Sequence, residues 1–150
     1  MQKKYTWRYR LGKLLQPLFP KIPRKDRQPF FVGFLKQELD KESFFKFAQG
    51  LGFEPQSIAW SDHEETLGLR KIEAHDIRFQ YHVRLFIDGE IRGHYEYTPE
   101  YAPFKHFYEI GFKDSSELLK VWFAPVLRED SGSTISHNAE AVSRTGPENG

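Results

Sequence analysis

Two histidines and a glutamate stand at alternating positions near the middle of the chain. The segment from Ile77 to Tyr97 alternates apolar and polar residues with the period of β-strands, and Asp88-Gly89 marks a hairpin turn within it. This period predicts that His82, His94 and Glu96 share one face of a sheet. Two imidazoles and a carboxylate are the ligands of a well-known class of metal site. The commoner reason for such alternation is a polar face in water, so the metal site is an alternative interpretation.

The length of the turn decides which residues lie opposite each other. A two-residue turn at Asp88-Gly89 would set Tyr81 against Glu96 and place polar groups on the apolar face. A three-residue turn over 87–89, with the glycine in a left-handed conformation, pairs Tyr81 with Tyr95 and keeps that face apolar. The pairs that this turn predicts on the opposite face are His82 with His94, Arg84 with Arg92, and Gln80 with Glu96.

The predicted pairing of Arg84 with Arg92 requires an anion, because like charges directly opposite each other destabilise a sheet. A bound phosphate would supply it, and so would Glu90 or Glu96 of the protein itself. If the face is open, its arginines and histidines offer the phosphate contacts and stacking surfaces of sheet-based proteins that bind single-stranded nucleic acid.

Charge is distributed unevenly along the chain. Residues 1–29 carry nine Lys or Arg and one Asp, a net charge of +8, whereas the other 121 residues carry a net charge of −7. A basic arm of this kind predicts contact with nucleic acid, with an anionic membrane surface, or with the acidic remainder of the same chain. The basic residues that we predict to make these contacts are Arg8, Arg10, Lys13, Arg24, Lys25 and Arg27.

Composition is typical of one intracellular domain. The chain has 150 residues, of which 39% are hydrophobic, and this is enough for a single core. It has no cysteine, which excludes disulfides and thiolate chemistry. No apolar run approaches the roughly 20 residues of a transmembrane helix. We therefore expect a cytoplasmic protein without a transmembrane segment, and the sequence indicates no particular cofactor.

The pattern of elements predicts a single α+β domain. We expect an antiparallel sheet of four or five strands with two main helices on one face. Residues 1–29 form the basic arm with its proline-rich linker, residues 30–128 the domain, and residues 129–150 a disordered tail without aromatic residues. The predicted strands are Phe30–Leu35, Ser57–Trp60, Leu67–Ala74 and the two of the hairpin, and the predicted helices begin at Asp40, at Asp114 and, for a short one, at Pro103.

Three further groups of residues have side chains suited to chemistry or recognition. His106 and Glu109 would be neighbours on the short helix and could bind a metal or move a proton. The acidic loop around His63, Glu64 and Glu65 could collect a cation, and the tyrosines between 95 and 101 could form a recognition surface. For each group, a structural or solvated role is the commoner reading.

The function that these patterns favour is a non-enzymatic binding or accessory protein. It would engage nucleic acid or a nucleoprotein through the basic arm, assisted by Arg84, Arg92, His82 and His94. The sequence lacks the motifs of common hydrolases and nucleotide-binding enzymes. One alternative is a small metal-assisted enzyme for a phosphate ester or other anionic substrate. A second is a protein-interaction adaptor whose arm tethers it to a membrane surface or a partner.

Overall fold

The structure, a computed structural model, describes residues 10–11, 14, 22–56 and 60–129. Within these residues a six-stranded sheet has the order β2-β7-β6-β5-β3, and β8 also pairs with β7. Its strands are β2 (Phe31–Phe34), β3 (Glu54–Pro55), β5 (Glu65–Ile72), β6 (Phe79–Phe86), β7 (Glu90–Tyr97) and β8 (Lys113–Asp114). A separate parallel pair consists of β1 (Ile22–Pro23) and β4 (Trp60–Ser61). The helices are α2 (Lys41–Gly50), α3 (Pro103–Phe107), α4 (Ser116–Phe123) and the 3-10 turn η3 (Ala124–Val126).

The central hairpin has the register that the alternation predicts. Tyr81 lies opposite Tyr95 and His82 opposite His94, and three residues join β6 to β7. Gly89 has a φ angle of 81°, a left-handed conformation that glycine adopts without strain. The predicted three-residue turn is therefore confirmed.

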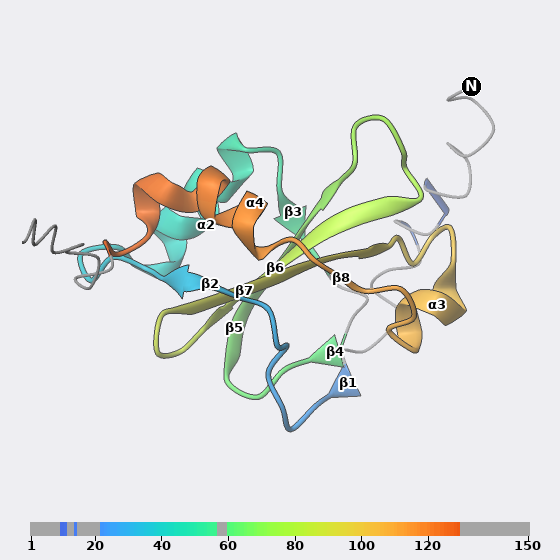
Figure 1. Cartoon of the computed structure of the whole chain (residues 1–150), viewed down its shortest axis with the longest axis horizontal. Helices are drawn as coiled ribbons and strands as arrows, with labels where there is room; N and C mark the ends of the chain where they lie inside the picture. The colour runs from blue at the N-terminus through green and yellow to red at the C-terminus, as the bar shows by residue number, and fades with distance from the viewer. Residues whose placement is uncertain (1–9, 12–13, 15–21, 57–59, 130–150) are drawn as a thin grey trace, which may run out of the picture.

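One face of the sheet carries the apolar core. Figure 1 shows α2 and α4 side by side on this face. α2 begins after Asp40, whose carboxylate accepts a hydrogen bond from the backbone N–H of Ser43. Its Phe44 stacks on Phe123 of α4, with ring centroids 5.3 Å apart. The buried core residues are Val32, Leu35, Phe44, Ala48, Phe53, Leu69, Val83, Leu85, Ile91, Leu119, Phe123 and Val126.

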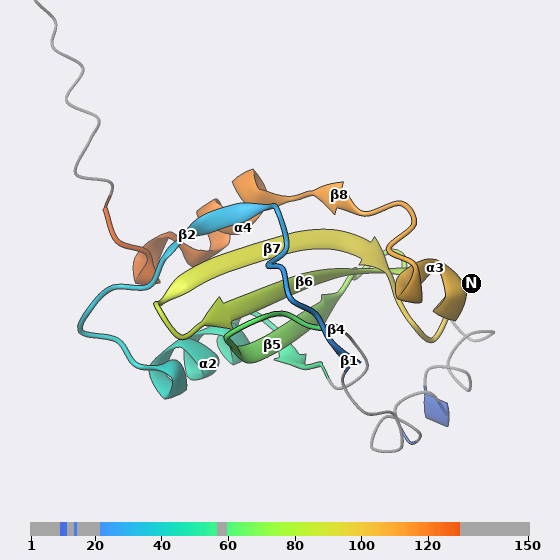
Figure 2. The same ribbon diagram turned by 90° about the horizontal axis from the view of Figure 1, so that it is seen from below.

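The opposite face is covered by short elements and connecting chain. α3 and the β1–β4 pair lie on the side of the sheet away from α2 and α4 (Figure 1). The segment that leads from β1 to β2 crosses in front of the strands (Figure 2). The sheet is thus enclosed on both faces, and its polar side chains lie inside the protein.

The observed fold confirms an α+β domain with a mostly antiparallel sheet, but it has more elements than we predicted. The described residues include the two-residue strands β3 and β8, which are too short to show a period. β5 starts at Glu65, inside the segment expected to be a loop. Residues 57–59, the predicted tail from residue 130 and most of the arm lie outside the described residues. Among the described helices, none combines the length and the apolar character needed to cross a membrane.

Gly93 permits α4 to pack closely on β7. A Cβ atom at this position would lie 2.4 Å from Cδ1 of Leu119 and 2.8 Å from the backbone oxygen of His82. We expect Gly93→Ala to lower the free energy of unfolding by about 1–3 kcal/mol, because one of these neighbours is backbone and cannot move aside.

The measurement is urea unfolding, with Gly50→Ala as the control. A Cβ at Gly50 meets nothing within 4 Å, and alanine favours a helix, so this change should be neutral or stabilising by up to about 1 kcal/mol. Equal effects of the two substitutions would contradict the packing at Gly93.

Candidate metal centre

The polar face of the hairpin is buried. Gln80, His82 and Arg84 of β6, and His94 and Glu96 of β7, are each at most 3% exposed. Their pairing is the one expected from the sequence. They do not, however, form an open face for a polyanion, because the chain on the side of β1 and α3 covers them (Figures 1 and 2).

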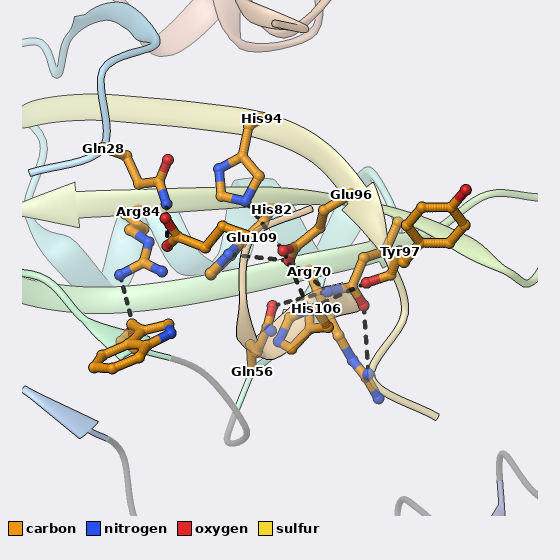
Figure 3. A network of polar contacts seen from close by, with 12 residues as sticks. Gln28, Gln56, Arg70, His82, Arg84, His94, Glu96, Tyr97, His106 and Glu109 are labelled. Carbon is orange, nitrogen blue, oxygen red and sulfur yellow. Dashed lines mark hydrogen bonds and ion pairs between the residues drawn. The ribbon is translucent and has the colours of Figure 1, made fainter. Parts of the chain in front are cut away.

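His82, His94 and Glu96 converge at the centre of this buried layer (Figure 3). Nδ1 of His82 lies 3.4 Å from Oε1 of Glu96, and Nε2 of His94 lies 3.3 Å from Oε2. One ligand atom from each of the three residues can be chosen so that all lie within 4.8 Å of one another. Donors that share an ion at about 2.1 Å are separated by no more than about 4.2 Å. A small inward rotation of the side chains would bring the three donor atoms within this distance of one another.

His106 of α3 is a fourth member of the cluster. Its Nδ1 lies 3.1 Å from Oε2 of Glu96 and 3.1 Å from the backbone oxygen of Tyr97. The sequence suggested a partnership between His106 and Glu109, but Glu109 instead contacts Arg24 and Gln28. α3 ends at Phe107, and Glu109 has a φ angle of 56°, so Glu109 does not continue the helical face of His106.

Glu96 differs from the other buried carboxylates in its partners. Among the described residues, its ion-pair partners are His82, His94 and His106, without an arginine. Nε2 of Gln80 donates a hydrogen bond of 2.8 Å to its Oε1. Both ring nitrogens of His82 and of His94 lack a hydrogen bond of normal geometry in the described structure. The cluster therefore combines a buried negative charge with ring nitrogens that are still available to a ligand.

Burial and neighbouring charge set the protonation states in the cluster. Burial, together with the adjacent Arg84, holds the pKa of His82 well below its usual value of 6.5. Burial would raise the pKa of Glu96, but His106 and His94 outweigh it and hold that pKa well below the usual 4.5. Neutral imidazole and ionised carboxylate are the forms that bind metal ions.

Carboxylates of the protein occupy the arginines of this face. Arg84 lies 2.9 Å from Asp62 and 2.7 Å from Glu65, and it also donates to the backbone oxygen of Trp60. Arg92, its cross-strand neighbour, pairs with Glu90 at 2.6 Å. The compensating anions thus come from the protein itself. Glu90, one of the two residues that the sequence suggested, pairs with Arg92, whereas Arg84 pairs with Asp62 and Glu65 and the other suggested residue, Glu96, pairs with neither arginine in the described structure.

A second buried arginine, Arg70 of β5, was not identified from the sequence. It contacts Glu100 at 2.7 Å and Glu54 at 3.1 Å. It also approaches the side-chain oxygen of Gln80, whose amide donates to Glu96. The only signal in the sequence was an arginine within an otherwise strand-like run, a pattern that also fits a residue exposed to water.

The arginines of the linker pair with acidic residues of the domain. Arg24 forms ion pairs with Asp62 and Glu109, and Arg27 forms ion pairs with Glu64, Asp88 and Glu90. Lys25 and Arg10 are exposed, whereas Arg8 and Lys13 lie outside the described residues. For Arg24 and Arg27, the structure therefore favours the interpretation that the basic segment folds back on the acidic remainder.

The other candidate groups lie apart from the histidine cluster. His63 and Glu64 are exposed and 3.7 Å apart, while Glu65 turns inward to Arg84. An open groove of about 490 Å³ lies beside β8 and the start of α4. Its lining residues are Tyr81, Tyr95, Lys113, Asp114, Ser115, Glu117 and Leu118, and they include no member of the cluster.

Comparison of the chain with known protein families, curated proteins and solved structures found no match.

The buried histidine predicts a pH-dependent stability. In the presence of a chelator, we expect the free energy of unfolding to fall as the pH drops below about 6.5, by up to about 1.4 kcal/mol per pH unit. The reason is that the unfolded chain protonates His82 there while the folded chain resists it. A further decrease should begin below about pH 4.5, because folding keeps Glu96 ionised.

Urea unfolding between about pH 3.5 and 8 covers both decreases, and His82→Gln should reduce the slope just below pH 6.5. His63→Gln is the matched control, because the side chain of His63 is exposed. An unchanged slope in His82→Gln would show that His82 is not the group that titrates.

Asp62 joins the linker, the β4–β5 loop and the sheet. Its carboxylate accepts from Arg24 at 2.9 Å and from the backbone N–H of Gln28 at 2.8 Å, and it lies 2.9 Å from Arg84. We expect Asp62→Asn to lower the free energy of unfolding by about 3–5 kcal/mol, because it removes the buried carboxylate that Arg24 and Arg84 share. Asp88→Asn alters a more exposed pair with Arg27 and should cost less than about 1 kcal/mol. Similar losses in urea unfolding would refute a special role for Asp62.

Proposed function

We propose that the chain is a metal-binding protein whose ion is held by His82, His94 and Glu96. The observation that carries the proposal is the convergence of three buried ligand groups, with potential donor atoms within 4.8 Å of one another. A divalent ion would offset the buried charge of Glu96, which has no arginine partner among the described residues. It would also satisfy imidazole nitrogens that lack hydrogen bonds.

The donor set favours a transition metal. Two imidazoles with one carboxylate suit Zn²⁺, Fe²⁺ or Co²⁺, whereas Ca²⁺ and Mg²⁺ prefer sites made of oxygen atoms. His106 is close enough to Glu96 to orient this carboxylate or to serve as a fourth donor after a small movement. Four protein donors in a closed interior would resemble a structural site rather than a catalytic one, which keeps a position open.

Binding is better supported than catalysis. The metal-assisted enzyme alternative needs arginines that meet an anionic substrate, but Arg84 and Arg92 already pair with carboxylates of the protein. The groove beside β8 is lined by none of the proposed ligands. We therefore propose that the ion stabilises the fold or is stored, rather than acting on a phosphate ester.

Binding of nucleic acid through the basic arm stays a prediction. Arg8 and Lys13 lie outside the described residues, and Lys25 is exposed. The hairpin residues that we expected to assist the arm are buried, so they add no support to this proposal.

The metal proposal predicts that chelator-treated protein binds one Zn²⁺ or Co²⁺ per chain and unfolds at a higher temperature. At an ion concentration of about 100 times the dissociation constant, stabilisation should reach about 2.7 kcal/mol. Glu96→Gln and His94→Gln should weaken binding by more than about 100-fold, since even groups that only orient a ligand contribute about 10–100-fold. Isothermal titration, Co²⁺ absorption spectra and thermal unfolding provide the readouts.

The exposed pair of His63 and Glu64 provides the matched control, because it has the same side-chain types outside the cluster. His63→Gln should leave metal affinity unchanged. The proposal fails if the chelator-treated protein takes up no ion at neutral pH. It also fails if His63→Gln abolishes binding while Glu96→Gln preserves it.

A further inference from the structure

The outer surface of α3 and the turn after it expose a cluster of large apolar side chains. Phe104 is 77% exposed, Phe107 42%, Tyr108 67% and Ile110 54%. We call these four residues the α3 patch. Four such residues lie within seven positions, and the ring centroids of Phe107 and Tyr108 are 5.3 Å apart. A local concentration of exposed apolar side chains of this kind usually marks a binding site.

The inner side of the same segment is firmly attached to the domain. His106 is buried and contacts Glu96, and Glu109 pairs with Arg24. Nε1 of Trp60 donates a hydrogen bond of 3.0 Å to the backbone oxygen of Phe107. Because these contacts fix the segment, the α3 patch is held outward, and covering it requires something outside the described residues.

The charged residues around the patch indicate the kind of surface that it binds. Lys105 is exposed between two members of the patch. Trp60 stacks near Phe107, with ring centroids 5.3 Å apart, and pairs with Ile22 in the β1–β4 ladder. Ile22, which follows the basic residues 1–21 in the sequence, therefore lies near the edge of the patch. Residues 1–21 contain six Lys or Arg and no Asp or Glu.

We infer that the α3 patch docks on an anionic lipid surface. Aromatic and aliphatic side chains beside a lysine suit the boundary between headgroups and acyl chains, where Phe and Tyr enter and Lys meets phosphate. A cationic segment attached at the edge of the patch adds attraction to anionic headgroups. A protein partner or a second copy would use the apolar side chains but gives no reason for the adjoining positive charge.

The test is flotation of the full chain with vesicles of phosphatidylcholine alone and of phosphatidylcholine with phosphatidylserine. We expect binding to the anionic vesicles only. The double variant Phe104→Ser, Tyr108→Ser should lower the partition coefficient by about tenfold or more, because it removes the two most exposed side chains of the patch. Its thermal unfolding should match the parent chain, since both side chains project from the surface.

Val121→Ser is the matched control, because Val121 is 72% exposed on α4, outside the patch. This variant should bind vesicles like the parent chain. If the double variant unfolds at a lower temperature, Ile110→Ser tests the same surface with a single change and should weaken binding in the same direction.

Three results would overturn the inference. If the chain does not bind anionic vesicles, docking on a lipid surface is ruled out, and if it binds both vesicle types equally, a role for charge is ruled out. If the double variant binds like the parent chain, the α3 patch is not the docking surface. If the parent chain is a dimer that the double variant converts to a monomer, and neither binds vesicles, the patch joins two copies of the chain instead.

Discussion

The three-residue turn between β6 and β7 is the constraint on which the rest of the structure depends. It sets the parity of every pair in the central hairpin, so that Tyr81 meets Tyr95 and His82 meets His94. A turn shorter by one residue would mix the two sets of side chains on both faces. With the observed parity, one face receives α2 and α4, and the other collects the charged groups. The rest of the chain covers both faces, so the hairpin has the apolar core on one side and a layer of buried charged residues on the other.

This buried charged layer is stable because nearly every charged side chain in it lies beside a side chain of opposite charge. A buried ion costs several kcal/mol unless a partner and hydrogen bonds compensate it. Arg84 has two carboxylates beside it, and so does Arg70. Glu96 is the exception, since imidazoles alone provide its ion-pair partners among the described residues. The negative charge of Glu96 is balanced by a proton or by a bound cation. The centre of the hairpin is therefore the part of the domain that responds to protons and to cations.

Local patterns predicted the hairpin and α2, whereas the covering of the polar face was not predictable. Alternation and turn length determine cross-strand pairs such as Gln80 with Glu96. Two-residue strands such as β3 and β8 leave no period to detect. The segments that cover the polar face are held by contacts between residues far apart in sequence, such as Arg24 and Glu109, which are 85 residues apart. The sequence likewise could not show that the turn after α3 separates His106 from Glu109.

Residues 22–30 contact residues that come much later in the chain. Arg24 and Gln28 are synthesised before their partners Asp62 and Glu109. The contacts that hold this segment over the sheet can therefore form only after the hairpin and α3 have been synthesised. An ion bound there would exchange only when this cover opens, so its residence time would depend on chain opening as well as on coordination strength.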